Sequence, residues 1–164
     1  MTPRRPGGSS PRFEEVSHTA DWALRVRGAT LAELFAHAAE GMYSLVGGRV
    51  AEGAPRITRE VSLAAPDVES LLVAWLNELL YLTESEAYMF DTFEMRDLGG
   101  AIRIDLPSPQ SGIFDGKSGG NRLVARVTGG RAAGLKKQIK ATTFHNLRIA
   151  TTKDGLETTI VFDV

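Results

Sequence analysis

The sequence predicts a single α+β domain, in which mixed or antiparallel sheets are covered by two main helices. Two segments repeat apolar residues at helical spacing, and several shorter segments alternate apolar and polar residues as half-buried strands do. Helical and strand segments are mixed along the chain without strict alternation, which favours an α+β fold over a parallel α/β sheet. The length of 164 residues fits one domain.

The composition excludes several classes of function. Lys plus Arg total 19 and Asp plus Glu total 20, and the resulting net charge of −1 does not indicate a broad phosphate-binding face. Because cysteine is absent, disulfides, thiol catalysis and cysteine-ligated zinc are excluded. No apolar run reaches the ~18 residues of a membrane span, and the first residues lack the apolar region of a secretory signal. We therefore expect a cytoplasmic protein.

Two segments lack the pattern of regular structure. Residues 1–12 are dominated by Pro, Gly, Ser and Arg and have little to bury, so they predict a disordered tail. Residues 107–120 are rich in Pro, Ser and Gly and predict a mobile surface loop. The folded domain is expected to span residues 13–164.

Two helices are predicted from capping residues and apolar spacing. The first follows Thr30, which forms a capping-box pattern with Glu33, and it ends at Gly47-Gly48. The second begins after Pro66, with Asp67 as its N-cap. The second helix has a wide apolar stripe that predicts a core-facing position, formed by Leu71, Leu72, Trp75, Leu76, Leu79 and Leu80.

Strands are predicted where apolar and polar residues alternate between turn residues. The expected strands cover residues 20–27, 57–63, 90–95, 101–106, 123–127, 138–150 and 156–164. The last two strands are expected to form a hairpin about the turn Asp154-Gly155. This turn would pair Ile149 with Ile160, Leu147 with Phe162, His145 with Val164, and Asn146 with Asp163.

Acidic groups near both ends of the folded part suggest a cation site. Asp21 lies on the polar side of its predicted strand, and Asp163 precedes the α-carboxylate of Val164. If these two strands are neighbours, the three groups converge, and like charges so close together favour a compensating cation. An all-oxygen site suits Ca²⁺ or Mg²⁺ rather than zinc. A solvated surface aspartate is the simpler interpretation of each residue alone.

Histidines and lysines give weaker patterns. His18 and Asp21 suggest an acid–base pair with His145 as a distant partner, but residues three apart on an extended segment point to opposite faces. His145 falls on the apolar side of its predicted strand, where a core histidine is the commoner outcome. A basic patch is expected from Lys136, Lys137, Lys140 and Arg148. A solvated face explains this patch as well as contact with nucleotide, RNA or a partner protein does.

Four stretches of the sequence resemble the archease family. In chain order, these stretches are Phe13–Trp22, Gly28–Phe35, Lys140–His145 and Val161–Val164. They extend the similarity over the chain from Phe13 onward and leave out only the tail. Two positions depart from the family pattern, since Ser17 stands where an acid is frequent and Phe144 where a tyrosine is common.

The resemblance implies a protein cofactor rather than an enzyme. Archeases assist the GTP-dependent, RtcB-type RNA ligase of tRNA splicing and RNA repair, and they promote ligase guanylylation and multiple turnover. The family's metal site, for which Ca²⁺ is favoured over Mg²⁺ or Mn²⁺, corresponds to Asp21, Asp163 and the terminal carboxylate of Val164.

The same resemblance suggests the partners. Lys140, and with it His18 and His145, would contact the ligase or its nucleotide. RNA would be reached only through the ligase, because an aromatic content of 7% offers no stacking platform for single strands. No membrane and no small-molecule substrate of the protein's own is expected.

Two other functions remain open. One is a metal-dependent phosphoester hydrolase that uses Asp21, Asp163 and His18. The other is a general chaperone or adaptor for RNA-modifying proteins. Turnover by the isolated protein would favour the hydrolase, and indifference to Asp163→Asn would favour the chaperone.

Overall fold

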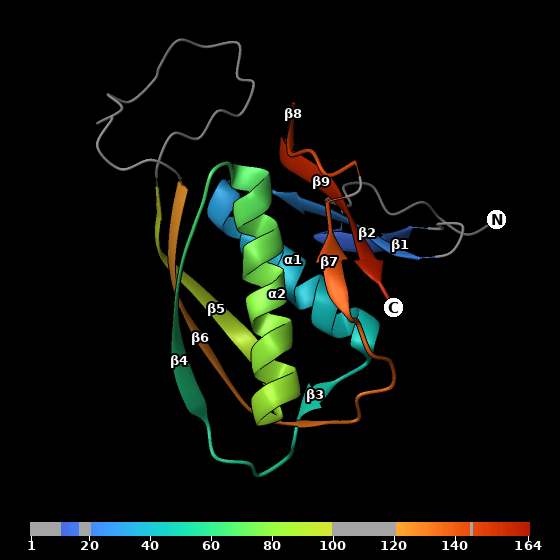
Figure 1. Ribbon diagram of the computed structural model, residues 1–164, viewed down its shortest axis with the longest axis vertical. Coiled ribbons are helices and arrows are strands. Elements are labelled where there is room, and N and C mark those ends of the chain that lie inside the picture. The colour runs from blue at the N-terminus through green and yellow to red at the C-terminus, as the bar shows by residue number, and fades with distance from the viewer. Residues whose placement is uncertain (1–10, 17–20, 100–120, 145) are drawn as a thin grey trace, which may run out of the picture.

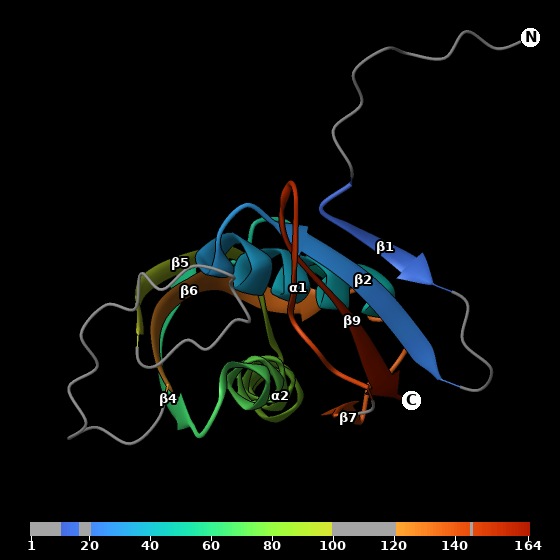
Figure 2. The same ribbon diagram turned by 90° about the horizontal axis from the view of Figure 1, so that it is seen from above.

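Two antiparallel sheets with two helices between them form the fold in the computed structural model (Figures 1 and 2). The structure describes residues 11–16, 21–99, 121–144 and 146–164. Both helices contact strands of both sheets, so the core lies in the middle layer. The predicted α+β class with two main helices is therefore confirmed.

The five-stranded sheet joins the two ends of the described chain. Its strands are β1 (Phe13–Val16), β2 (Trp22–Gly28), β7 (Ala141–Thr143), β8 (Ala150–Thr152) and β9 (Gly155–Asp163). Their order is β1-β2-β9-β7, and β8 also pairs with β9. β2 and β9 pair antiparallel along their whole length, from Trp22 opposite Phe162 to Gly28 opposite Leu156. The strand that follows Asp21 and the strand that contains Asp163 are thus neighbours.

The four-stranded sheet comes from the middle of the chain. Its strands are β3 (Arg49–Val50), β4 (Ile57–Ala65), β5 (Tyr88–Gly99) and β6 (Asn121–Ala133). β6 pairs antiparallel with each of the other three. The predicted strands 57–63, 90–95 and 123–127 lie within these longer elements, whereas β1 and β3 were not predicted.

Both helices begin at the predicted caps. α1 (Leu31–Val46) follows Thr30, whose hydroxyl accepts a hydrogen bond from the Glu33 amide at 3.2 Å, and Gly47 ends it in the left-handed conformation. α2 (Val68–Glu86) follows Asp67, whose carboxylate accepts from the Ser70 amide at 2.7 Å. These contacts satisfy amides that the first helical turn leaves without partners.

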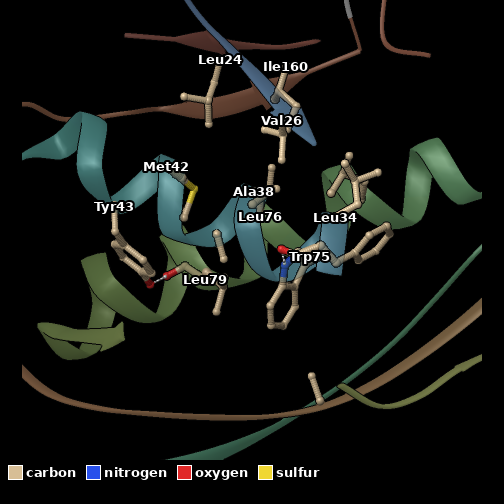
Figure 3. Close-up of a cluster of buried hydrophobic side chains, with 14 of the residues drawn as sticks. Leu24, Val26, Leu34, Ala38, Met42, Tyr43, Trp75, Leu76, Leu79 and Ile160 are labelled. Atoms are coloured by element: carbon tan, nitrogen blue, oxygen red, sulfur yellow. Dashed lines mark hydrogen bonds between the residues drawn. The ribbon is translucent and has the colours of Figure 1, made fainter. Parts of the chain in front are cut away.

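The core is built where the two helices meet the two sheets (Figure 3). Trp75 of α2 is fully buried, and its indole N–H donates to the Phe35 carbonyl of α1 at 3.0 Å. The Tyr43 hydroxyl of α1 lies 3.4 Å from the Leu79 carbonyl of α2, so the two helices are joined at a second point. Leu24 and Ile160 close the core from the five-stranded sheet.

The C-terminal hairpin differs from the prediction. Lys153 and Asp154 form the turn, and Thr152 pairs with Gly155, so the expected turn Asp154-Gly155 is wrong. The expected strand 138–150 is wrong as well, because β7 and β8 are separated by residues 144–149. Asp163 therefore lies opposite Ala141 and not opposite Asn146, and Phe162 lies opposite Thr142 and not Leu147.

Local contacts explain why the chain leaves the sheet after β7. Asn146 has a φ of 51°, a left-handed conformation that asparagine tolerates and that a strand does not contain. The Leu147 amide donates to the Phe144 carbonyl at 3.1 Å and closes a turn. The Ile149 amide donates to the Glu69 carboxylate of α2 at 3.3 Å, so at this residue the chain is bound to the helix and not to a strand ladder.

Several predictions fall outside the described residues. These are most of the tail 1–12, the loop 107–120, the strand 101–106, and both His18 and His145. Neither described helix is long and apolar enough to cross a membrane.

Candidate functional site

Asp21 directly precedes β2 and Asp163 is the last residue of β9, so both belong to the same end of the five-stranded sheet. Trp22 lies opposite Phe162 in the β2–β9 ladder, and the same register continued by one residue sets Asp21 opposite Asp163. Opposite residues of an antiparallel pair have Cα atoms about 5 Å apart and side chains on the same face. The two carboxylates therefore share the outer face, since Phe162 points into the core and is fully buried.

The opposite end of this outer face carries acids that are already paired. Arg27 contacts Glu14 and Glu157, each at 3.1 Å, and Arg25 contacts the same two acids at 3.1 and 3.5 Å. Because the Arg27 guanidinium donates a hydrogen bond to it, the pKa of Glu14 is lowered from its ordinary value. No such pair is formed by Asp21 or Asp163 within the described part of the chain.

Lysines approach the acidic end from the segment before β7. The Lys140 amide donates to the Asp163 carbonyl at 2.8 Å, which fixes this exposed residue beside the last strand. The Lys137 ammonium lies 3.8 Å from the centre of the Trp22 ring, one residue away from Asp21. The segment 136–140 is thus held against both strands that carry the aspartates.

Asp21 and Asp163, the acidic side chains that the structure describes at this end, offer oxygen donors only. Asp163 is exposed, and the following Val164 is 38% exposed. Among the described residues, no three His, Cys, Asp or Glu side chains gather closely enough to hold a metal ion. A cation at this end would therefore need further donors besides Asp21 and Asp163. Such a set fits a hard cation with oxygen ligands and does not fit zinc.

The predicted basic patch is divided by the structure. Lys140 lies beside Asp163, whereas Lys136 and Lys137 line a groove between the two helices and the segment after β6. The Arg148 carbonyl accepts a hydrogen bond from the Thr158 hydroxyl at 2.8 Å, which places this residue along the middle of β9. Asp163 lies opposite Ala141, so the predicted pairing of Asn146 with Asp163 does not form.

Sequence reasoning missed the contact between Lys137 and Trp22. Trp22 and Lys137 are more than a hundred residues apart in the sequence, so no local pattern predicts that they are in contact. It also missed the arginine–glutamate network, although Glu14, Arg25, Arg27 and Glu157 all lie on polar positions of strands. Once the β1-β2-β9 register is known, alternation alone places these four residues on one face.

Comparison with known proteins agrees with this architecture. The sequence model of the Archease protein family matches residues 13–164. The chain belongs to the archease family. It is 32% identical over 158 residues to the archease of Methanosarcina acetivorans, with 93% of this chain and 96% of that protein covered. It is 33% identical over 149 residues to the archease of Thermococcus gammatolerans, with 88% and 92% covered.

Solved structures show the same archease fold. A solution structure of a Methanobacterium thermoautotrophicum protein superposes with a TM-score of 0.69 at 24% identity, and covers 93% of this chain and 99% of its own. A crystal structure from Thermotoga maritima, described as an archease and possible chaperone, superposes with a TM-score of 0.56 at 19% identity, over 98% and 100%. At these identities the likeness establishes the fold alone.

Proposed function

We propose that this protein is a metal-binding cofactor that activates a GTP-dependent, RtcB-type RNA ligase. It would promote guanylylation and multiple turnover of the ligase in tRNA splicing or RNA repair, and would not be an enzyme itself. The observation that carries this proposal is the β2–β9 register, in which Trp22 lies opposite Phe162, the chain neighbours of Asp21 and Asp163. Membership of the archease family supports the same assignment.

The unpaired aspartates favour a ligand-binding role over a structural one. Carboxylates that share a sheet face repel each other unless a cation or basic group compensates them. At the other end of this face arginines supply that compensation, whereas at the acidic end no described side chain forms an ion pair with Asp21 or Asp163. Asp21, Asp163 and the Val164 carboxylate would hold Ca²⁺, with Mg²⁺ or Mn²⁺ as alternatives.

The acidic end is suited to dock at a nucleotide-dependent active site. It lies at the edge of the molecule, and its exposed residues can reach a partner without opening the core. Lys140 lies beside Asp163 and would orient the phosphate groups of the ligase nucleotide. A bound divalent cation would neutralise charge on phosphate oxygens there.

The test is multiple-turnover ligation by a cognate ligase, with and without this protein. Asp163→Asn removes one charge without changing side-chain volume, and we expect it to reduce the stimulation about tenfold or more. The matched control is Asp154→Asn, which makes the same change at the exposed turn between β8 and β9. Thermal unfolding should show that both variants remain folded.

Each outcome separates the candidate functions. Full stimulation by Asp163→Asn would contradict a role for the acidic end. Phosphoester turnover by the isolated protein would indicate the hydrolase. Protection of the ligase from aggregation without any effect on guanylylation would indicate a chaperone, the role named as possible for the Thermotoga maritima archease.

A further inference from the structure

A groove separate from the acidic end is lined by the C-terminal halves of α1 and α2 and by the segment between β6 and β7. Its volume is about 490 Å³, within the size range of ligand sites. Apolar side chains such as Val46, Leu80 and Ile139 make most of its surface. Because the groove is open along one side, it suits an inserted side chain better than an enclosed small molecule.

Leu135 stands at the edge of this groove. Its side chain is 48% exposed, although it belongs to a residue type that is mostly buried. The backbone around it is fixed, because the Lys136 amide donates to the Val46 carbonyl at the end of α1 at 2.8 Å. The exposed leucine is therefore held in place by the fold beside an apolar depression, a combination typical of contact surfaces.

The hydroxyl groups of Tyr43 and Thr83, which line the groove, are both hydrogen-bonded. The Tyr43 hydroxyl lies 2.9 Å from the Thr83 hydroxyl, and Thr83 donates to the Leu79 carbonyl at 2.9 Å. Burial raises the pKa of Tyr43 above its ordinary value, so this phenol stays neutral. Tyr43 is thus a buried and uncharged part of the groove, with 3% of its surface exposed.

The charge at the rim is mainly positive. Lys136 and Lys137 lie on one wall, and Glu84 of α2 lies on the other. Within the described residues neither lysine forms an ion pair with an acidic side chain. The Lys137 ammonium lies over the Trp22 ring, next to Asp21 at the acidic end. One partner could therefore contact both the groove and the acidic end.

We propose that this groove binds a short segment of a partner protein, in which one or two large apolar side chains are flanked by Asp or Glu. The apolar side chain enters between Leu80 and Leu135, and the acidic flank lies along Lys136 and Lys137. A basic flank would be repelled on this wall, which makes the charge of the partner a specific requirement. This inference does not depend on a metal or on a ligase.

The experiment selects binders to the full chain from a displayed library of random dodecapeptides. We expect enriched sequences that combine large apolar residues with an excess of Asp and Glu. The affinity of the most enriched peptide is then measured by fluorescence anisotropy against variants of the protein. Lys136→Glu and Leu135→Ala should each weaken binding by roughly tenfold, while thermal unfolding confirms that they are folded.

Two controls locate the binding surface. Lys153→Glu reverses a charge at the exposed turn between β8 and β9, outside the groove, and should leave the affinity unchanged. Asp163→Asn should also leave the peptide affinity unchanged. A negative result for the groove is therefore distinguishable from a negative result for the proposed cation site. Absence of enrichment, enrichment of basic peptides, or equal binding to Lys136→Glu would overturn the proposal.

Discussion

The two ends of the outer face of the five-stranded sheet handle acidic residues in opposite ways. At one end, Glu14 and Glu157 are bound by Arg25 and Arg27, each of which contacts both acids. At the other end, Asp21 and Asp163 share a register position, and within the described chain no basic side chain pairs with them. Acidic side chains are thus paired with arginines at one end, and at the other end no described basic side chain forms an ion pair with them.

We assign the paired end to the stability of the fold and the acidic end to the proposed function. Paired charges join β1, β2 and β9, whereas the charges of Asp21 and Asp163 would be compensated by the proposed cation. The two ends share a core underneath, formed in part by Phe162 and Ile160. Changes to the core, the paired end and the acidic end should therefore have distinct and decreasing effects on stability.

Loss of the shared core should have the largest effect. Phe162 is fully buried and lies between Trp22 and Thr142, directly before Asp163. Phe162→Ala should lower the free energy of unfolding by about 3–5 kcal/mol, because it removes buried apolar surface and leaves a cavity. Chemical denaturation measures the change, and a loss below about 1 kcal/mol would contradict the assigned core.

Removal of the central arginine at the paired end should have a smaller effect. Arg27→Met keeps the aliphatic part of the side chain and removes the guanidinium that bridges β1 and β9. The expected loss is roughly 1 kcal/mol, since the side chain is partly exposed and the pairs are screened by solvent. If the loss is the same in high salt, the electrostatic explanation is wrong.

Lowering the pH should reduce the contribution of the paired end to stability, and the size of this loss should depend on Arg27. The pKa of Glu14 is lowered in the folded protein, chiefly by the hydrogen bond from Arg27. Its contribution to stability is therefore present above the ordinary value of 4.5 and is lost as the pH falls through the lowered pKa. Thermal unfolding as a function of pH should show a smaller acid-induced loss in Arg27→Met than in the wild type, and equal losses would exclude this linkage.

Local patterns predicted the helices and several strands. The Thr30–Glu33 and Asp67 caps and the Gly47 terminus depend on neighbours within a few residues, so the sequence carries the whole signal. The alternation of β2 likewise placed Leu24 and Val26 in the core. That β2 and the last strand are neighbours was only a condition in the sequence argument, and the β2–β9 ladder fulfils it.

Non-local contacts explain what the sequence did not predict. A two-residue turn at Asp154-Gly155 and one at Lys153-Asp154 differ by a single position, and that shift changes every partner along the hairpin. The Ile149 amide donates to the Glu69 carboxylate of α2. These residues are 80 positions apart in the chain, so the sequence around residue 149 does not predict the contact. The sequence did not predict the groove either, because its walls come from three separate parts of the chain.

The central claim is that Asp21, Asp163 and the Val164 carboxylate bind a divalent cation together. The direct measurement is a Ca²⁺ titration followed by amide chemical shifts in ¹⁵N-labelled protein. We expect saturable shifts at Asp21, Trp22, Asp163 and Val164 that Asp163→Asn abolishes and Asp154→Asn preserves, with unfolding free energies of both variants within about 0.5 kcal/mol of the wild type without Ca²⁺. No saturable shift, or the same shifts in Asp163→Asn, would contradict the claim.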